Sequence, residues 1–176
     1  MSALTIDVLG TPAPQGSKKG FYNPKLGRVQ IVEDAKQKTR TWRQDVLTAA
    51  VDAQPDDWQA IDGPVWVEVC FYFKRPAAHF GTGRNAGALK DSAPSHPAVK
   101  PDIDKVLRAT LDGLANAGCY VNDSRVVSVT VEKRYVDQQR RLEGAHIELY
   151  TLDQTSGSAS LGGEAASATS VQEALI

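Results

Sequence analysis

The chain is poor in cysteine and has no long apolar run. Its two cysteines, Cys70 and Cys119, lie far apart and outside any CxxC pair, a spacing that excludes a disulfide scaffold and offers no zinc site. No apolar stretch approaches the ~18–20 residues of a membrane span. The N-terminal MSALTIDVLG lacks the basic and long apolar regions of a secretory signal. We therefore expect a cytoplasmic protein with no membrane partner.

An excess of one charge is also lacking, since the net charge is −1, but the charges are segregated along the chain. Residues 18–43 contain eight basic side chains and two acids, whereas residues 44–73 contain six acids and no base. Such a basic stretch is by default a solvated surface. Beside a phosphodiesterase site it is instead a candidate footprint for the DNA backbone.

The C-terminal residues 151–176 are rich in Ser, Ala and Gly and contain no basic or aromatic residue. They cannot bury enough apolar surface to offset the entropy of ordering them, so we expect a flexible tail. The remaining residues 1–150 are enough for one domain with a sizeable core.

The apolar periodicity predicts a mixed order of strands and helices. Alternating side chains predict strands near residues 4–8 and over VWVEVCFYF (65–73), and FYNPKLGRVQIV (21–32) has the turn residues of a hairpin. Helical spacing predicts helices over 34–54 and 102–116, separated by a long loop over about 75–100 that we expect to be functional or mobile. A short strand at 119–121 and strands over VVSVTVEKRYV and AHIELYTL complete the pattern. The fold class is therefore α+β: a small mixed, largely antiparallel sheet with two main helices on one face, in a single domain.

The most informative segment runs KPDIDKVLRATLDGL (100–114) and continues as YVNDSRVV (120–127). Asp102 is a good N-cap residue for the second helix, and Pro101 fits a helix start. One interpretation is therefore structural: Asp102 and Asp104 cap the helix and complement its dipole. Apolar spacing defines one buried stripe on this helix, formed by Ile103, Val106, Leu107, Leu111 and Leu114.

The other interpretation is a metal site. A non-helical Asp102 can converge with Asp104 just outside the helix end, and Asp123 follows a tight turn before the next strand. If the two segments lie side by side, three carboxylates form a highly negative cluster that a hard cation such as Mg²⁺ or Mn²⁺ would neutralise. The D-x-D pattern is a weak signal, and spacing alone leaves both interpretations open.

The same segment resembles the signature of the RusA family of Holliday-junction resolvases, whose common form runs K-P-D-(I/L)-D-N-hydrophobic-x-K-A-x-x-D-A-L and then D-D-(A/S)-x-(V/I)-V. The likeness spans about 30 residues at preserved spacing, and a weaker likeness covers the rest of residues 1–150. It implies a homodimeric, Mg²⁺- or Mn²⁺-dependent endonuclease of DNA recombination and repair. Members cut four-way junctions by paired symmetric nicks that leave 5′-phosphates and 3′-hydroxyls. Because such resolvases are often carried by phages and prophages, the resemblance also implies a viral source.

The resemblance implies site residues as well. The three essential carboxylates match Asp102, Asp104 and Asp123, which would hold one or two Mg²⁺ ions, and the family's helix lysine matches Arg108. Arg108 keeps the positive charge that stabilises a transition state but cannot give up a proton as lysine can. Lys105 stands at a family Asn position, where its charge is available to compensate, and Asn122 replaces a family Asp.

Several basic side chains are expected to contact DNA, namely Lys18, Lys19, Lys25, Arg28, Lys100, Lys105 and Lys133. Two other functions stay open at this stage. One is a structure-selective nuclease that acts on flaps or forks, and the other is a non-catalytic junction-binding protein in which Arg108 marks lost catalysis. The complete set of three Asp residues favours catalysis.

Overall fold

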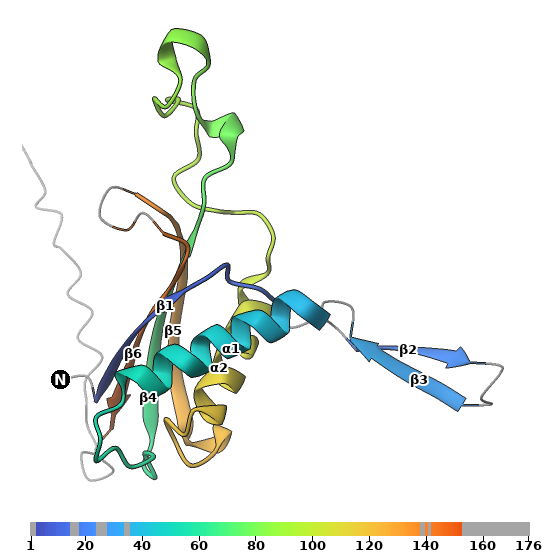
Figure 1. The fold of residues 1–176 in the computed structure, drawn as a ribbon, viewed down its shortest axis with the longest axis vertical. Helices are drawn as coiled ribbons and strands as arrows, with labels where there is room; N and C mark the ends of the chain where they lie inside the picture. Colours follow the sequence, from blue (N-terminus) through green and yellow to red (C-terminus); the bar gives the residue numbers. More distant parts are fainter. Residues whose placement is uncertain are drawn as a thin grey trace, which may run out of the picture.

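The centre of the protein is a four-stranded sheet of order β1-β6-β4-β5 (Figure 1). The computed structural model describes residues 3–14, 18–23, 28–33, 36–137, 140 and 142–152. For residues 18–23, 28–33 and 36–40, it describes the backbone alone. β6 (Gly144–Thr151) pairs antiparallel with both β1 (Leu4–Leu9) and β4 (Val65–Phe73). β5 (Val126–Tyr135) pairs parallel with β4. The predicted α+β class with a largely antiparallel sheet is confirmed.

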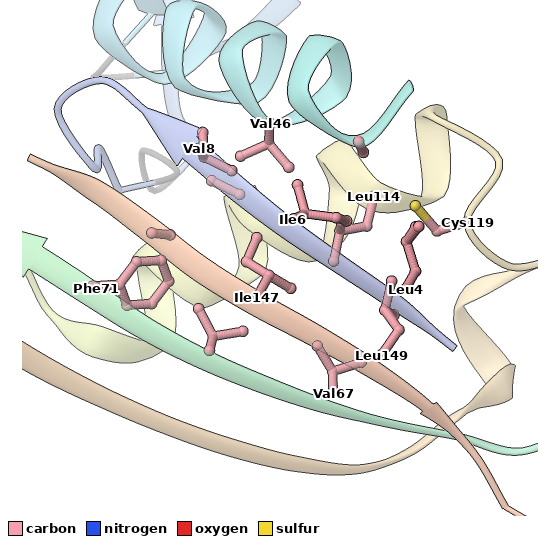
Figure 2. Close-up of a cluster of buried hydrophobic side chains, with 14 of the residues drawn as sticks. Leu4, Ile6, Val8, Val46, Val67, Phe71, Leu114, Cys119, Ile147 and Leu149 are labelled. Atoms are coloured by element: carbon pink, nitrogen blue, oxygen red, sulfur yellow. The ribbon is translucent and has the colours of Figure 1, made fainter. Parts of the chain in front are cut away.

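Two helices, α1 (Lys36–Ala53) and α2 (Ile103–Asn116), cover one face of this sheet (Figure 1). The alternating residues of the strands place β-branched and aromatic side chains on that face, where they meet the helices. Figure 2 shows Ile6, Phe71 and Ile147 of the sheet in one cluster with Val46 of α1 and Leu114 of α2. The core therefore lies between the sheet and the two helices.

The two helices approach each other closely at Gly113. A Cβ atom at this position would lie 2.8 Å from Cγ1 of Val46. Nearby, the indole Nε1 of Trp42 donates a 3.0 Å hydrogen bond to Oγ1 of Thr110, and that hydroxyl donates to the carbonyl of Val106. These contacts fix α2 against α1, and so fix the direction in which the outer face of α2 points.

The helical stripes are confirmed only in part. On α1, the apolar spacing of Trp42, Val46, Leu47, Ala50 and Val51 predicts one stripe facing the core; Trp42, Val46 and Ala50 are fully buried, but Val51 is 49% exposed. On α2, Val106 and Leu114 are buried, whereas Leu107 and Leu111 are half-buried.

The predicted hairpin is present as β2 (Lys18–Asn23) and β3 (Arg28–Glu33), an antiparallel pair in which Tyr22 opposes Val29. It extends away from the sheet beyond the first turn of α1 (Figure 1). Lys25 lies outside the described residues, as do the side chains of Lys18, Lys19 and Arg28. Residues 153–176, where a flexible tail is predicted, lie outside them too.

The long connection between β4 and α2 is more structured than its composition suggests. It contains the short 3₁₀ turns η1 (Ala77–His79) and η2 (Gly83–Asn85) and projects from the sheet (Figure 1). Backbone hydrogen bonds from Gly81 to Ala88 and from Lys90 to His79 close it into a narrow loop. The guanidinium of Arg75 stacks 4.3 Å from the ring centroid of Tyr135 and ties the loop to β5.

The strand predicted at 119–121 is not formed, because Tyr120 makes a single parallel bridge to Ile61 in this described segment. The 3₁₀ turn η3 (Asp123–Arg125) follows directly and leads into β5. Within the described part of the chain, no helix combines the length and the apolar character of a transmembrane segment.

Candidate functional site

A cavity of about 270 Å³ lies between α2 and the start of β5. Its polar wall comes largely from α2, because Asp104, Arg108 and Asp112 follow one another at intervals of four residues and so share one face of the helix. Asp123 of η3 lines the same cavity. The remaining lining residues are Leu107, Leu111, Tyr120 and Val126. The fold thus brings Asp104, Arg108 and Asp123, all predicted from the sequence, to one cavity.

Asp123 is presented by a tight turn. The side-chain oxygen of Asn122 accepts a 3.0 Å hydrogen bond from the backbone N–H of Ser124, and the Asn122 carbonyl accepts one of 3.1 Å from the N–H of Arg125. Arg125 in turn forms a 2.5 Å ion pair with Asp62. An amide oxygen at residue 122 therefore serves the turn as an acceptor, although a family Asp is replaced there.

Asp102 does not line the cavity in this structure. Its backbone is extended (φ −67°, ψ 133°), as expected for an N-cap, and its carbonyl accepts the hydrogen bond from the N–H of Val106. Its side chain, however, caps no amide in the described first turn of α2. It accepts a 2.5 Å hydrogen bond from Nζ of Lys105 instead, and that ammonium is the main reason that the pKa of Asp102 is lowered. The prediction that the Asp102 side chain caps α2 is therefore wrong, whereas Asp104 does lie in the first helical turn, where its charge complements the helix dipole.

The three predicted metal ligands, Asp102, Asp104 and Asp123, do not form one cluster in this structure. Within the described ranges, no three His, Cys, Asp or Glu side chains are close enough together to bind one ion. Asp104 and Asp123 nevertheless offer oxygen donors to the same cavity, and Mg²⁺ is commonly held by one or two carboxylates, with waters and substrate phosphates in its other positions. The donor set fits such an ion, while Asp102, which holds Lys105 through Oδ2, lies outside the cavity lining.

Two cavity residues were not singled out by the sequence. Oδ2 of Asp112 accepts a 2.7 Å charged hydrogen bond from Arg43 of α1, which compensates its charge. Tyr120 donates a 2.9 Å hydrogen bond from its hydroxyl to the carbonyl of Leu111, and burial, with the nearby charges of Asp123 and Asp112, raises its pKa. The spacing of Asp112 from Asp104 and Arg108 is the signal that could have identified the first of them.

The lysines expected to contact DNA differ in their surroundings. Lys100 is exposed, and Lys105 is paired with Asp102. Lys133 of β5 directs its ammonium to two backbone carbonyls, those of Val99 at 2.7 Å and Pro101 at 2.9 Å. The Lys100–Pro101 peptide bond in this segment is cis.

Comparison with known proteins identifies the family. A family model described as "Endodeoxyribonuclease RusA" matches residues 12–145, which is well over half of the chain and includes every cavity residue named above. No curated protein matches the sequence. The chain therefore belongs to the RusA family of endodeoxyribonucleases, which implies an endonuclease acting on Holliday junctions.

Proposed function

We propose that this protein is a metal-dependent resolvase, which cuts four-way DNA junctions by paired symmetric nicks and serves DNA recombination and repair. The observation that carries the proposal is the cavity that Asp104, Arg108 and Asp123 line together, in a chain of the RusA family. Two carboxylates and a guanidinium suit a phosphodiester group, which needs a cation on its oxygens and a positive charge on its transition state.

In this proposal Asp104 and Asp123 would hold Mg²⁺ or Mn²⁺. Asp102 would become the third ligand when its carboxylate binds the ion in place of Lys105. Such an ion, when bound, polarises the scissile phosphate and lowers the pKa of a water molecule that attacks it. Asp123 stands on the rigid turn made by Asn122, and Asp104 on the first turn of a helix packed against α1. Both carboxylates are therefore held by elements that need little rearrangement.

Arg108 supplies the fixed positive charge. It lies one helical turn beyond Asp104, on the same cavity wall. A guanidinium is always protonated and can bind two phosphate oxygens at once, so it orients the phosphate and offsets the charge that builds up on it. It does not deliver a proton to the leaving oxygen, so in this proposal that proton comes from Lys105 or from solvent.

We further propose that the chain acts as a homodimer on DNA. A two-fold enzyme presents two cavities to a nearly two-fold junction, which explains paired cuts. The basic hairpin β2–β3 extends from the body of the protein (Figure 1). It would then contact the DNA backbone through Lys18, Lys19, Lys25 and Arg28. Lys100, shortly before α2, and Lys105, in its first turn, would contact the backbone near Asp104.

The test is a cleavage assay on three labelled substrates: a four-way junction, a linear duplex of the same sequence and a flap. Each is incubated with purified protein in Mg²⁺ or in a chelator and run on a denaturing gel. The proposal predicts paired nicks at related positions in opposing strands of the junction, in Mg²⁺ alone. Preferential cutting of the flap would indicate a flap or fork nuclease instead. Junction binding with intact strands would indicate a non-catalytic junction-binding protein.

A further inference from the structure

We propose that Lys133 is a positioning residue: it holds residues 99–101, the segment immediately before Asp102, against β5 through hydrogen bonds to two backbone carbonyls. This inference rests on the proposed function, because what it positions is the acidic end of the cavity. It gives Lys133 a different role from the DNA contact that its charge suggests in the sequence.

The contacts of the ammonium carry the first step. Nζ of Lys133 lies 2.7 Å from the carbonyl oxygen of Val99 and 2.9 Å from that of Pro101, and 5.8 Å from the ring centroid of Phe73 on β4. The Cα atom of Lys133 pairs in register with Phe71, which is fully buried. The base of the side chain is thus fixed on the edge strand β5, beside the buried strand β4, while its tip reaches the connecting segment.

The place of these carbonyls in the chain carries the second step. Pro101 directly precedes Asp102, whose own carbonyl accepts the first hydrogen bond of α2 from Val106. A shift of residues 99–101 would therefore move Asp102 and the first turn of α2, which carries Asp104. Carbonyl oxygens in such a segment have no partner within a helix or strand of their own, so a cation that bridges two of them restricts the segment strongly.

The origin of Lys133 carries the third step. β5 begins at Val126, directly after the η3 turn that contains Asp123. β5 therefore follows Asp123 directly in the chain, and its Lys133 is hydrogen-bonded to the backbone that leads to Asp102 and Asp104. Lys133 therefore links β5 to the start of α2 and helps to set the distance between the two sides of the cavity, which is why we assign it a positioning role.

The test compares Lys133→Met with Lys133→Arg and with Arg134→Met. Methionine keeps the length of the side chain and removes the donors, and arginine restores a charged donor. Arg134 is the next residue of β5, exposed on the opposite face and paired with Glu132, so its substitution removes an equal charge elsewhere. Single-turnover cleavage of the junction at saturating protein gives the cutting rate, and titration in a chelator over a range of salt gives the affinity and its salt slope.

Lys133→Met is expected to slow cutting by about 10²-fold, the cost typical of a displaced catalytic group, with junction affinity within about twofold and an unchanged salt slope. Lys133→Arg is expected to recover most of the rate, and Arg134→Met to resemble the parent protein. A phosphate contact would instead weaken binding and reduce the salt slope by about 1. That result, or an unchanged cutting rate in Lys133→Met, would overturn the proposal.

Amide hydrogen exchange of residues 106–109, the first N–H groups of α2 with acceptors in the helix, supplies a readout that needs no activity. Loss of the carbonyl bonds in Lys133→Met should speed exchange there, while the strands of the sheet keep their protection. If the parent protein cuts no junction, the proposed function fails, and unchanged exchange would then refute the structural link as well. Should Lys133→Met fail to fold by circular dichroism, Lys133→Gln replaces it in every arm.

Discussion

The ammonium of Lys105 donates a 2.5 Å hydrogen bond to the carboxylate of Asp102, three residues before it at the start of α2. Both side chains are exposed, and the pairing lowers the pKa of Asp102 and raises that of Lys105. The carboxylate that the family resemblance assigns to a metal is thus occupied by an internal cation. A divalent ion that binds this carboxylate is therefore opposed by the positive charge of Lys105 beside it.

Replacing Lys105 by Gln removes this competition, and two results are expected. The pKa of Asp102 should rise toward its ordinary value of 3.8, because the hydrogen bond from Lys105, the main cause of its lowering, is gone. Binding of Mg²⁺ should become tighter, since a positive charge beside the carboxylates is lost. Carboxyl NMR titration and calorimetry measure the two, and Lys105→Arg is the control that keeps the charge. Weaker Mg²⁺ binding in Lys105→Gln would contradict the account.

The ion pair between Asp102 and Lys105 exists only over a limited range of pH. It needs Asp102 ionised and Lys105 protonated, so it is present from the lowered pKa of Asp102 up to the raised pKa of Lys105. Whatever it contributes to the folded state is lost as the pH falls through the Asp102 pKa, below 3.8, and again as the pH rises through the Lys105 pKa, above 10.5. Between these limits, competition with a metal ion at Asp102 should not vary with pH.

Arg108 is expected to act through its charge. Arg108→Met should lower the rate of junction cutting by about 10²-fold or more, as does the loss of one charged or hydrogen-bonding group at a developing oxyanion. Arg108→Lys should retain most of the rate, because lysine keeps the charge on the same cavity wall. Single-turnover kinetics with both variants decide this. Equal losses in Arg108→Met and Arg108→Lys would show that the two-oxygen grip of the guanidinium matters, and full activity of Arg108→Met would remove the residue from the mechanism.

Gly113 is predicted to be intolerant of a methyl group. A Cβ at this position would lie 2.8 Å from Val46 and 3.2 Å from the carbonyl of Arg43, so α1 and α2 would have to separate. Gly113→Ala should lower the free energy of unfolding by about 1–3 kcal/mol, the usual cost of overpacking, and the melting temperature by several degrees. Gly63→Ala is the matched control, since nothing described lies within 4 Å of its added Cβ. A neutral Gly113→Ala would contradict the close helix contact.

The basic hairpin is predicted to contribute to affinity and not to chemistry. Lys19→Ala should weaken junction and duplex binding alike and reduce the slope of log affinity against log salt by about 1, with the saturating cutting rate unchanged. Lys90→Ala removes a lysine from the loop between β4 and α2 and serves as a comparison for the loss of one charge. Binding measured over a range of salt is sufficient. An unchanged slope in Lys19→Ala would remove this residue from the DNA surface.

The elements that the sequence predicts best are those with strong local patterns. The strand over 65–73 has the predicted bounds, because Val65, Val67 and Val69 alternate with side chains of the outer face. Residues 119–121 have equally strong apolar character, yet Tyr120 forms only one bridge, to Ile61. A strand needs a neighbour over several residues, and which segment lies alongside is decided by the packed fold and not by local pattern.

The candidate site divides in the same way. Asp104, Arg108 and Asp123 could be identified from motif spacing, and the fold places all three on one cavity. The partners of Asp112 and Lys133 could not, since Arg43 stands on another helix and the acceptors of Lys133 are backbone carbonyls. Backbone carbonyls are present at every residue, so no pattern of side chains shows which of them a lysine will reach.

The most direct test of the account is the comparison of Asp104→Asn and Asp123→Asn with Asp57→Asn, an exposed acid that does not line the cavity. For each variant, cutting of a labelled four-way junction in Mg²⁺ is measured beside junction binding in a chelator. We predict that both cavity variants lose cutting and keep the affinity of the parent protein, while Asp57→Asn keeps both. Cutting at the parent rate by either cavity variant would contradict the central claim that these carboxylates form the active site.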